Sequence, residues 1–204
     1  RQVVLRWLDP EPVSQPDFIS PPVYDLYGSL PSQGTAEMAV FYVDFPDCRF
    51  DYTPGIDGVR EAVFGDANEN SPAYPFESMN AFFKRSSKGA VELDGQVYTY
   101  TTKNPKYYYE NDVWHVALVN ELIAAFDGQV DFSQFDGDND RTIDAILISV
   151  PNKAGDDNWW PAAGIFGGER YNRADGMNVG HVIVGNAEIK NEKDGQSNFV
   201  SSYC

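Results

Sequence analysis

The sequence predicts a single α+β domain that contains buried β-strands and amphipathic helices. Three observations favour this class: apolar runs that suit buried strands, amphipathic segments with helical spacing, and an alternating stretch typical of antiparallel strands. The 204 residues are 42% hydrophobic and 14% aromatic, which is enough apolar material for one substantial core. We expect residues 1–36, rich in proline, to form an extended lead-in segment and residues 37–204 to form the domain.

The predicted strands differ in how strongly their sequences favour burial. Residues 39–45 (AVFYVDF) and 143–150 (IDAILISV) carry apolar side chains on both faces and therefore predict strands inside the sheet. Residues 89–100 alternate apolar and polar side chains around Asp94-Gly95, a dipeptide typical of tight turns. This pattern predicts an antiparallel hairpin.

Three segments show the spacing of amphipathic helices. Residues 56–64 and 76–85 are expected to form two helices, each followed by a glycine that can end it. Residues 111–126 give the clearest helical pattern, with apolar side chains recurring every three or four positions. Asn111 or Asp112 can cap the start of this third helix.

Charge and composition exclude several classes of partner. Fifteen basic against 31 acidic residues give a net charge of -16, which repels a nucleic acid backbone and an anionic membrane surface alike. No apolar run approaches the roughly 18 residues that span a bilayer. The excess of carboxylates suits an extracellular protein that binds calcium. The two cysteines, Cys48 and Cys204, either form a disulfide that closes a long loop or remain thiols.

An acidic loop supplies the clearest candidate site. Asp136, Asp138, Asp140 and Asp144 occupy relative positions 1, 3, 5 and 9, and Thr142 at position 7 can offer its backbone carbonyl. Alternate side chains of a tight loop can point at one centre, and four like charges so close together repel one another unless a cation joins them. The alternative is a solvated acidic turn held by side-chain hydrogen bonds. We expect a calcium site.

The loop departs from an EF-hand at two positions. Arg141 stands where a glycine normally makes the turn, and Leu147 stands where a bidentate glutamate would be. A sensor of the EF-hand type is therefore not expected. A structural calcium ion that links a helix to a strand fits better, with Asp131 or another nearby oxygen completing the coordination.

Four stretches between residues 37 and 161 carry a further signal through their order and spacing: AVFYVDFPDCRF, ESMNAFFKRSSKGAVELDGQVYTY, VDFSQFDGDNDRTIDAILISV and DDNWWP. Together they resemble the immune inhibitor A family of secreted zinc metallopeptidases. Residues 1–36 and 162–197 match much less clearly.

The resemblance implies a zincin-like fold, in which a twisted mixed β-sheet is packed with helices, and this chain would be its N-terminal part. It also implies a protein or peptide substrate. In such folds zinc is bound by an HExxH motif on a helix, and this chain contains no such motif. Residues 198–204 are similar to the entry into that helix, so the ligands are expected in a further C-terminal part of the same protein. The chain alone is then expected to be inactive.

The resemblance also implies an edge strand that pairs with extended substrate. His181, Val182, Ile183 and Val184 are the candidate for this strand, after a long glycine-rich loop over residues 152–180. The substrate would bind to the main chain of this strand, and the His181 side chain itself is expected to be structural rather than a zinc ligand.

An alternative to a peptidase is a non-catalytic extracellular binding module or an inactive member of the peptidase fold. Trp159 and Trp160 can form a platform for a sugar or another ligand, although two tryptophans beside a proline more often anchor a packed loop. The histidine that precedes the third predicted helix, His115, is expected to be an ordinary boundary residue.

Overall fold

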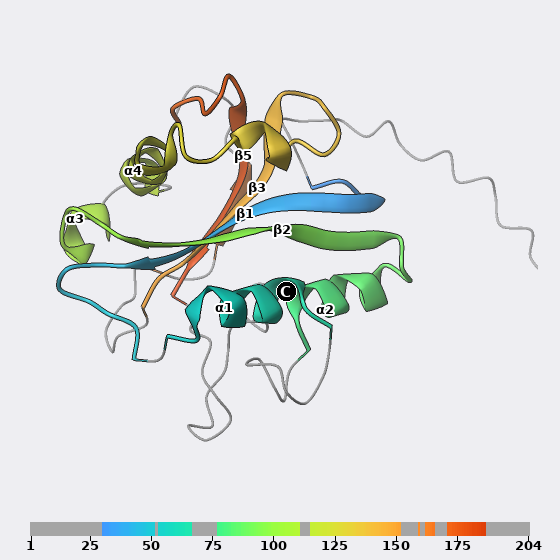
Figure 1. The fold of residues 1–204 in the computed structure, drawn as a ribbon, viewed down its shortest axis with the longest axis horizontal. Helices are drawn as coiled ribbons and strands as arrows, with labels where there is room; N and C mark the ends of the chain where they lie inside the picture. The colour runs from blue at the N-terminus through green and yellow to red at the C-terminus, as the bar shows by residue number, and fades with distance from the viewer. Residues whose placement is uncertain are drawn as a thin grey trace, which may run out of the picture.

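The computed structural model describes residues 30–51, 53–66, 77–110, 115–151, 159, 162–165 and 171–186 of the chain. A five-stranded sheet in the order β2-β1-β3-β5-β4 lies at its centre (Figure 1). Its strands are β1 (Gly34–Asp44), β2 (Val91–Thr101), β3 (Thr142–Ser149), β4 (Ala162–Ile165) and β5 (Asn178–Gly185). Strands β1, β2, β3 and β5 run parallel and β4 pairs antiparallel with β5, so the sheet is mixed, as the resemblance implies.

The two apolar runs form strands inside the sheet, which confirms their prediction. β1 lies between β2 and β3, and β3 lies between β1 and β5. Every residue of β3 is buried, which agrees with its apolar side chains on both faces. β1 starts before the expected domain boundary, so residues 34–36, assigned above to the lead-in segment, belong to the sheet.

Each predicted helical segment contains a helix. The helices are α1 (Gly55–Phe64), α2 (Met79–Ser86), α3 (Lys106–Glu110), α4 (Val116–Phe126) and the short 3-10 helix η2 (Phe132–Phe135). α2 begins where the Ser78 side chain accepts a hydrogen bond from the Ala81 amide at 3.0 Å. α4 begins after His115, while the expected caps at 111 and 112 lie outside the described residues.

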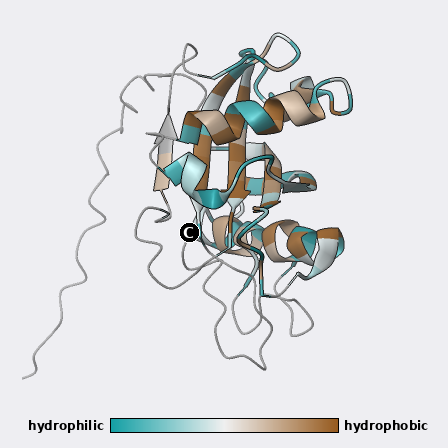
Figure 2. Cartoon of the chain, turned by 90° about the vertical axis from the view of Figure 1, so that its left-hand side faces the viewer, coloured by the Kyte–Doolittle hydropathy of each residue, from teal (hydrophilic) through white to brown (hydrophobic). Residues whose placement is uncertain are grey.

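Two hydrophobic clusters attach the helices to opposite faces of the sheet. On one face α1 and α2 pack against the side chains of Met38, Val40 and Leu147. On the other face α4 and η2 pack against Phe41, Ile146 and their neighbours. Figure 2 shows hydrophobic residues dominating the strands between these layers. Each large apolar side chain buried in this way contributes about 1.5–3 kcal/mol to folding.

The predicted hairpin over residues 89–100 is wrong. β2 is one continuous strand that pairs in parallel with β1 along its whole length, and Asp94-Gly95 lies in its middle. Gly95 has a φ of 151°, and a Cβ atom there would lie 2.0 Å from the Met38 carbonyl oxygen of β1. The glycine therefore permits a close backbone approach and does not make a turn.

The loop expected over residues 152–180 also contains regular structure. β4 lies within it, and Ala174 and Met177 form an isolated antiparallel bridge further along. Cys48 is buried, and Cys204 lies outside the described residues. In the described ranges, no helix is both long and apolar enough to cross a membrane.

Candidate metal site

The acidic loop joins η2 to β3 and is anchored at both ends by buried residues. Phe132 and Phe135 of η2 are fully buried, and β3 enters the sheet immediately after the loop. Asp131 caps η2, because its Oδ1 atom accepts hydrogen bonds from the amide and the hydroxyl of Ser133, at 3.0 and 2.6 Å. These bonds lower the pKa of Asp131 and hold its carboxylate at the helix start.

Three of the predicted ligands come together in this loop. Asp136, Asp138 and Asp144 each place a carboxylate oxygen so that the three oxygens lie within 4.8 Å of one another. Calcium binds oxygen at about 2.3–2.6 Å, so two ligands on opposite sides of one ion are about 5 Å apart. The spacing of these oxygens is therefore compatible with a shared cation.

Backbone amides already fold the loop around Asp136. Its Oδ1 atom accepts a hydrogen bond from the Asp140 amide and its Oδ2 atom accepts one from the Arg141 amide, both at 2.9 Å. Asn139 and Arg141 have φ values of 62° and 68°, in the left-handed region. Arg141 thus makes the turn that a glycine makes in an EF-hand, at a conformational cost of about 1 kcal/mol.

Asp144 is the buried member of the cluster, with 2% of its surface exposed. Burial raises its pKa to about 6, and the nearby carboxylates of Asp138 and Asp136 add to this effect. The amides of Glu37 and Gly137 oppose it by donating to Oδ2, at 3.3 and 3.2 Å. Asp144 is therefore a carboxylate whose ionised form a bound cation would stabilise.

The spacing of the acidic residues does not predict the two backbone amides that donate to Asp144. Glu37 belongs to β1 and lies far from the loop in the sequence, so only the fold brings its amide to Asp144. Gly137 stands between two acidic residues, and a Cβ atom there would lie 2.9 Å from Asp144 Oδ2. In the sequence, the only local indication of this close approach is that a glycine, Gly137, lies between the candidate ligands Asp136 and Asp138.

Of the other predicted calcium ligands, the carboxylates of Asp140 and Asp131 lie outside the three-oxygen cluster, and the Thr142 carbonyl stays a prediction. Asp140 is exposed and contributes its backbone amide to Asp136 and Asp138. Thr142 is buried at the start of β3, where it pairs with Asn178 of β5. Asp131, considered as a completing ligand, caps η2 instead.

The donor atoms distinguish between calcium and zinc. A cluster of carboxylate oxygens suits calcium, whereas zinc sites in proteins use mainly histidine and cysteine. The sequence has only two histidines: His115 stacks on Trp159 with ring centroids 4.4 Å apart, and His181 lies on β5. Among the described residues neither histidine belongs to a group of metal-ligating side chains. This part of the protein therefore does not fit a zinc centre.

The expectation that residues His181–Val184 form an edge strand is wrong. Their strand, β5, lies between β3 and β4 and pairs with both. His181 pairs with Ile165 and Val184 pairs with Ala162, so main-chain groups of β5 are used on both sides. Within the described residues, the strand at this end of the sheet is β4. Burial also lowers the pKa of His181 and favours the neutral imidazole, consistent with a structural residue.

Trp159 is a packed anchor, as the commoner interpretation of the tryptophan pair expects. Its side chain is fully buried, with its ring 5.6 Å from that of Phe45. The Lys106 ammonium lies 5.4 Å from the same indole and donates to the Pro151 carbonyl at 2.6 Å. Trp159 therefore cannot offer its face to an external sugar, and Trp160 lies outside the described residues.

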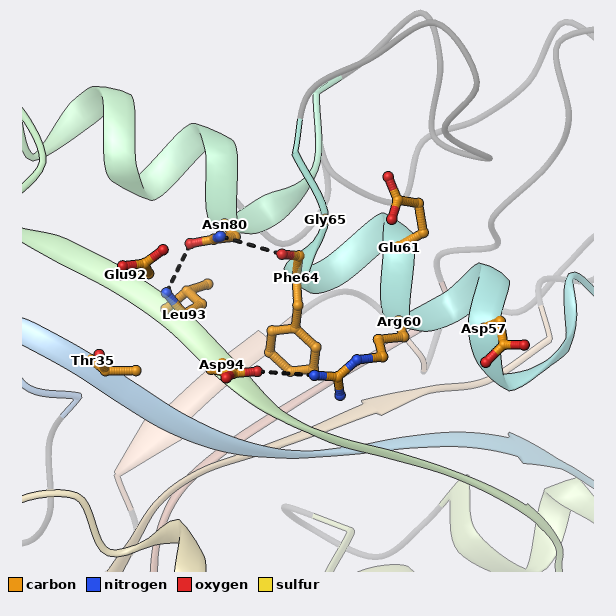
Figure 3. Close-up of a pocket in the computed structure, with 10 residues that line it drawn as sticks. All are labelled: Thr35, Asp57, Arg60, Glu61, Phe64, Gly65, Asn80, Glu92, Leu93 and Asp94. Carbon is orange, nitrogen blue, oxygen red and sulfur yellow. Dashed lines mark hydrogen bonds and ion pairs between the residues drawn. The ribbon is translucent and has the colours of Figure 1, made fainter.

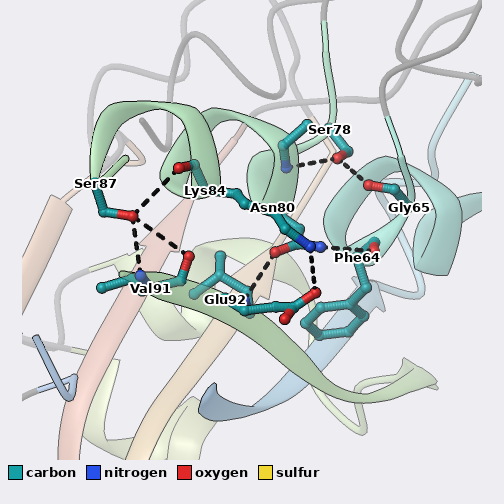
Figure 4. A network of polar contacts seen from close by, with 10 residues as sticks. Phe64, Gly65, Ser78, Asn80, Lys84, Ser87, Val91 and Glu92 are labelled. Atoms are coloured by element: carbon teal, nitrogen blue, oxygen red, sulfur yellow. Dashed lines mark hydrogen bonds and ion pairs between the residues drawn. The ribbon is translucent and has the colours of Figure 1, made fainter. Parts of the chain in front are cut away.

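A polar cavity of about 590 Å³ lies between α1, α2 and β2 (Figure 3). It is lined by charged side chains that include Asp57, Glu61 and Glu92, and Arg60 crosses it to Asp94 with a 3.2 Å ion pair. Asn80, at its inner wall, bonds the Leu93 amide at 2.9 Å. Arg60 and Asn80 bond to β2 across this cavity, and Glu92 pairs with Lys84 at 2.7 Å (Figure 4).

The chain was compared with protein-family models and with curated proteins, and neither comparison gave a match. The assignment of a function therefore depends on the site geometry and on the segments of sequence described above.

Proposed function

We propose that this chain is the calcium-stabilised N-terminal part of a secreted zinc metalloendopeptidase of the immune inhibitor A type. The observation that carries the proposal is the convergence of Asp136, Asp138 and Asp144 in the loop between η2 and β3. The ion would be structural, because it joins the loop to the end of a fully buried strand. Calcium would neutralise three carboxylates, one of which is desolvated.

The peptidase part of the proposal rests on the sequence resemblance and is compatible with the fold. A twisted mixed sheet backed by helices is what the resemblance implies, and the described residues form a mixed sheet with helices on both faces. The segments that carry the resemblance form β1, α2 with β2, and the calcium loop with β3. We propose that zinc ligands come from residues beyond this sequence, so no catalytic step is assigned to the residues described here.

The proposed place of substrate shifts from β5 to β4. A peptide in an extended conformation can add to the free side of an edge strand through main-chain hydrogen bonds. β4 is antiparallel to its neighbour and forms one end of the described sheet. A substrate strand would therefore lie beside Ala162–Ile165 and not beside His181–Val184.

Isothermal titration with calcium tests the metal part of the proposal. One ion per chain is expected for the wild type, with affinity lost at least tenfold in the Asp136→Asn and Asp138→Asn variants, because each removes a charged ligand. Asp127→Asn is the matched control, since this exposed aspartate lies outside the cluster. An unchanged affinity in the first two variants would contradict the assignment.

The peptidase part needs a separate test on a longer protein. The reading frame that continues past Cys204 is expected to encode HExxH, and the longer protein is expected to hydrolyse casein in a zinc-dependent manner. A frame without that motif would remove the peptidase assignment and leave calcium binding unaffected.

A further inference from the structure

A short segment before β5 contacts both ends of the acidic loop. Residues 174–177 form a tight turn that lies at the same end of the sheet as the loop before β3 (Figure 1). Asp175 in this turn bonds to the start of η2, and Asn178, the first residue of β5, bonds to the residue at the end of the loop. The segment therefore bridges the two ends of the loop.

The backbone of the turn suits its sequence. Asp175 and Gly176 have φ values of 51° and 80°. The amides of Ala174 and Met177 each donate to the other residue's carbonyl, at 3.2 and 2.8 Å. Positive φ at both central residues is typical of a type I′ turn, in which Asp-Gly is a favoured pair. Ala174 is buried in the same hydrophobic cluster as Phe132, so the turn is fixed to the layer that contains η2.

The first contact is between Asp175 and the start of η2. Asp175 Oδ2 accepts a hydrogen bond from the Phe132 amide at 2.8 Å. The first amides of a helix have no acceptor inside it, and Asp131 accepts from the next one, that of Ser133. η2 ends at Asp136, whose amide donates to the Ser133 carbonyl at 3.3 Å. Because η2 is so short, the position of Phe132 determines that of Asp136, a candidate calcium ligand.

The second contact is between Asn178 and the end of the loop. The Asn178 amide donates to the Arg141 carbonyl at 2.9 Å. The Arg141 amide in turn donates to Asp136 Oδ2, also at 2.9 Å. The same carboxylate is therefore connected to the segment before β5 from both sides. β5 continues to His181–Val184, which pair with β4, the proposed substrate edge.

The clustered carboxylates make this bridge important for metal binding. Without a cation, Asp136, Asp138 and Asp144 repel one another, and this repulsion favours opening of the loop. Contacts that hold the loop closed oppose the opening and so favour binding of the ion. When two sites stabilise the same arrangement, each strengthens the other by the same factor.

We propose that Asp175 is a positioning residue of the calcium site, which holds η2 and Asp136 in the arrangement that binds the ion. This inference rests on the proposed calcium site. Asp175 lies outside the three-oxygen cluster, so it acts through the Phe132 amide and not as a ligand. The converse effect follows, because calcium then stabilises the turn at Asp175 and the start of β5.

Isothermal titration with calcium tests the positioning role. Asp175→Gly removes the acceptor but keeps a residue that suits the turn, and it should bind calcium about fivefold or more weakly than the wild type. Asp175→Asn keeps an oxygen acceptor and tolerates positive φ, so its affinity should stay within about twofold of the wild type. Asp127→Gly is the matched control, since it makes the same change at an exposed position outside the cluster and should bind like the wild type.

Hydrogen exchange measures the converse effect. In the wild type, calcium is expected to slow exchange of the Phe132 and Met177 amides, which bond to Asp175 and across the turn. In Asp175→Gly the slowing at Met177 should be lost, whereas the slowing at Asp140 and Arg141, inside the loop, should remain. The wild-type measurement needs no variant, so it tests the proposal even if Asp175→Gly fails to fold.

The outcomes separate this inference from the calcium site itself. Calcium binding that is equally tight in the wild type and in Asp175→Gly overturns the positioning role and leaves the site intact. So does a wild-type Met177 amide whose exchange is independent of calcium. Asp175→Asn binding as weakly as Asp175→Gly overturns it too, because the charge and not the hydrogen bond would then act. A wild type that binds no calcium contradicts the proposed site together with this inference.

Discussion

The acidic loop and strand β2 differ in where their geometry is encoded. In the loop, the three clustered carboxylates come from residues that lie within nine positions of one another, so their spacing indicates a common centre. In β2, the Met38 carbonyl of β1, which is distant in the sequence, leaves no room for a Cβ atom at Gly95. A local pattern can therefore be interpreted from sequence, whereas a contact between distant strands requires the fold.

The largest expected effect comes from breaking the distant contact. Gly95→Ala would place a Cβ atom 2.0 Å from the Met38 carbonyl oxygen, and should reduce the free energy of unfolding by about 3 kcal/mol or more. Gly89→Ala is the control: Gly89 also has a positive φ, 81°, but nothing lies within 4 Å of its Cβ position. About 1 kcal/mol is expected there. Equal losses in urea unfolding would show that the close approach is not decisive.

A second prediction concerns the pH dependence of the calcium-free loop. The pKa of Asp144 is raised from 3.8 to about 6 in the folded state, so the folded state holds this proton more tightly than the unfolded state. In EDTA, the stability of the wild type relative to Asp144→Asn should be greatest near pH 4. It should fall by about 2–3 kcal/mol as the pH rises through 6, and should level off near pH 7.

Urea unfolding of both proteins at several pH values measures this difference. Asp127→Asn serves as the comparison, because its aspartate is exposed and lies outside the cluster. With saturating calcium the trend should reverse, since the ion favours the ionised carboxylate. A difference between wild type and Asp144→Asn that rises with pH in EDTA would be incompatible with a desolvated Asp144.

The smallest effect concerns the turn of the loop. Arg141 adopts a φ of 68°, which glycine adopts with little strain. Arg141→Gly should therefore raise the free energy of unfolding by about 1 kcal/mol or less, part of the gain being offset by the greater freedom of glycine in the unfolded chain. Thermal unfolding in EDTA measures the change. A loss of stability would mean that the arginine side chain supports the loop.

The same distinction explains how much of the fold the sequence predicts. β1 and β3 were predicted because apolar residues on both faces require burial on both faces, and α1 because its apolar spacing is helical. β2 was mistaken for a hairpin because Asp94-Gly95 usually makes a turn, and only β1 shows otherwise. β5 was taken as an edge strand because the resemblance implies one, and β4, with the sequence AAGI, has too weak a strand pattern to indicate that it pairs with β5.

The candidate site shows the same division between local and distant information. Asp136, Asp138 and Asp144 were identified from spacing, which the loop preserves. Asp140 was included by analogy with a ligand pattern, but its carboxylate lies outside the cluster and its backbone amide donates to Asp136 and Asp138. The Thr142 carbonyl stays a prediction. The Glu37 amide was missed, because it approaches Asp144 only after β1 and β3 pair.

Thermal unfolding with and without calcium tests the central claim, that the acidic loop holds a structural calcium ion, most directly. At about 100 times the dissociation constant, binding adds about 2.7 kcal/mol, which corresponds to a Tm about 5–10 °C higher than in EDTA. The Asp136→Asn/Asp138→Asn double variant should lose this difference, and Asp127→Asn should keep it. A wild type whose Tm is the same in calcium and in EDTA would contradict the claim.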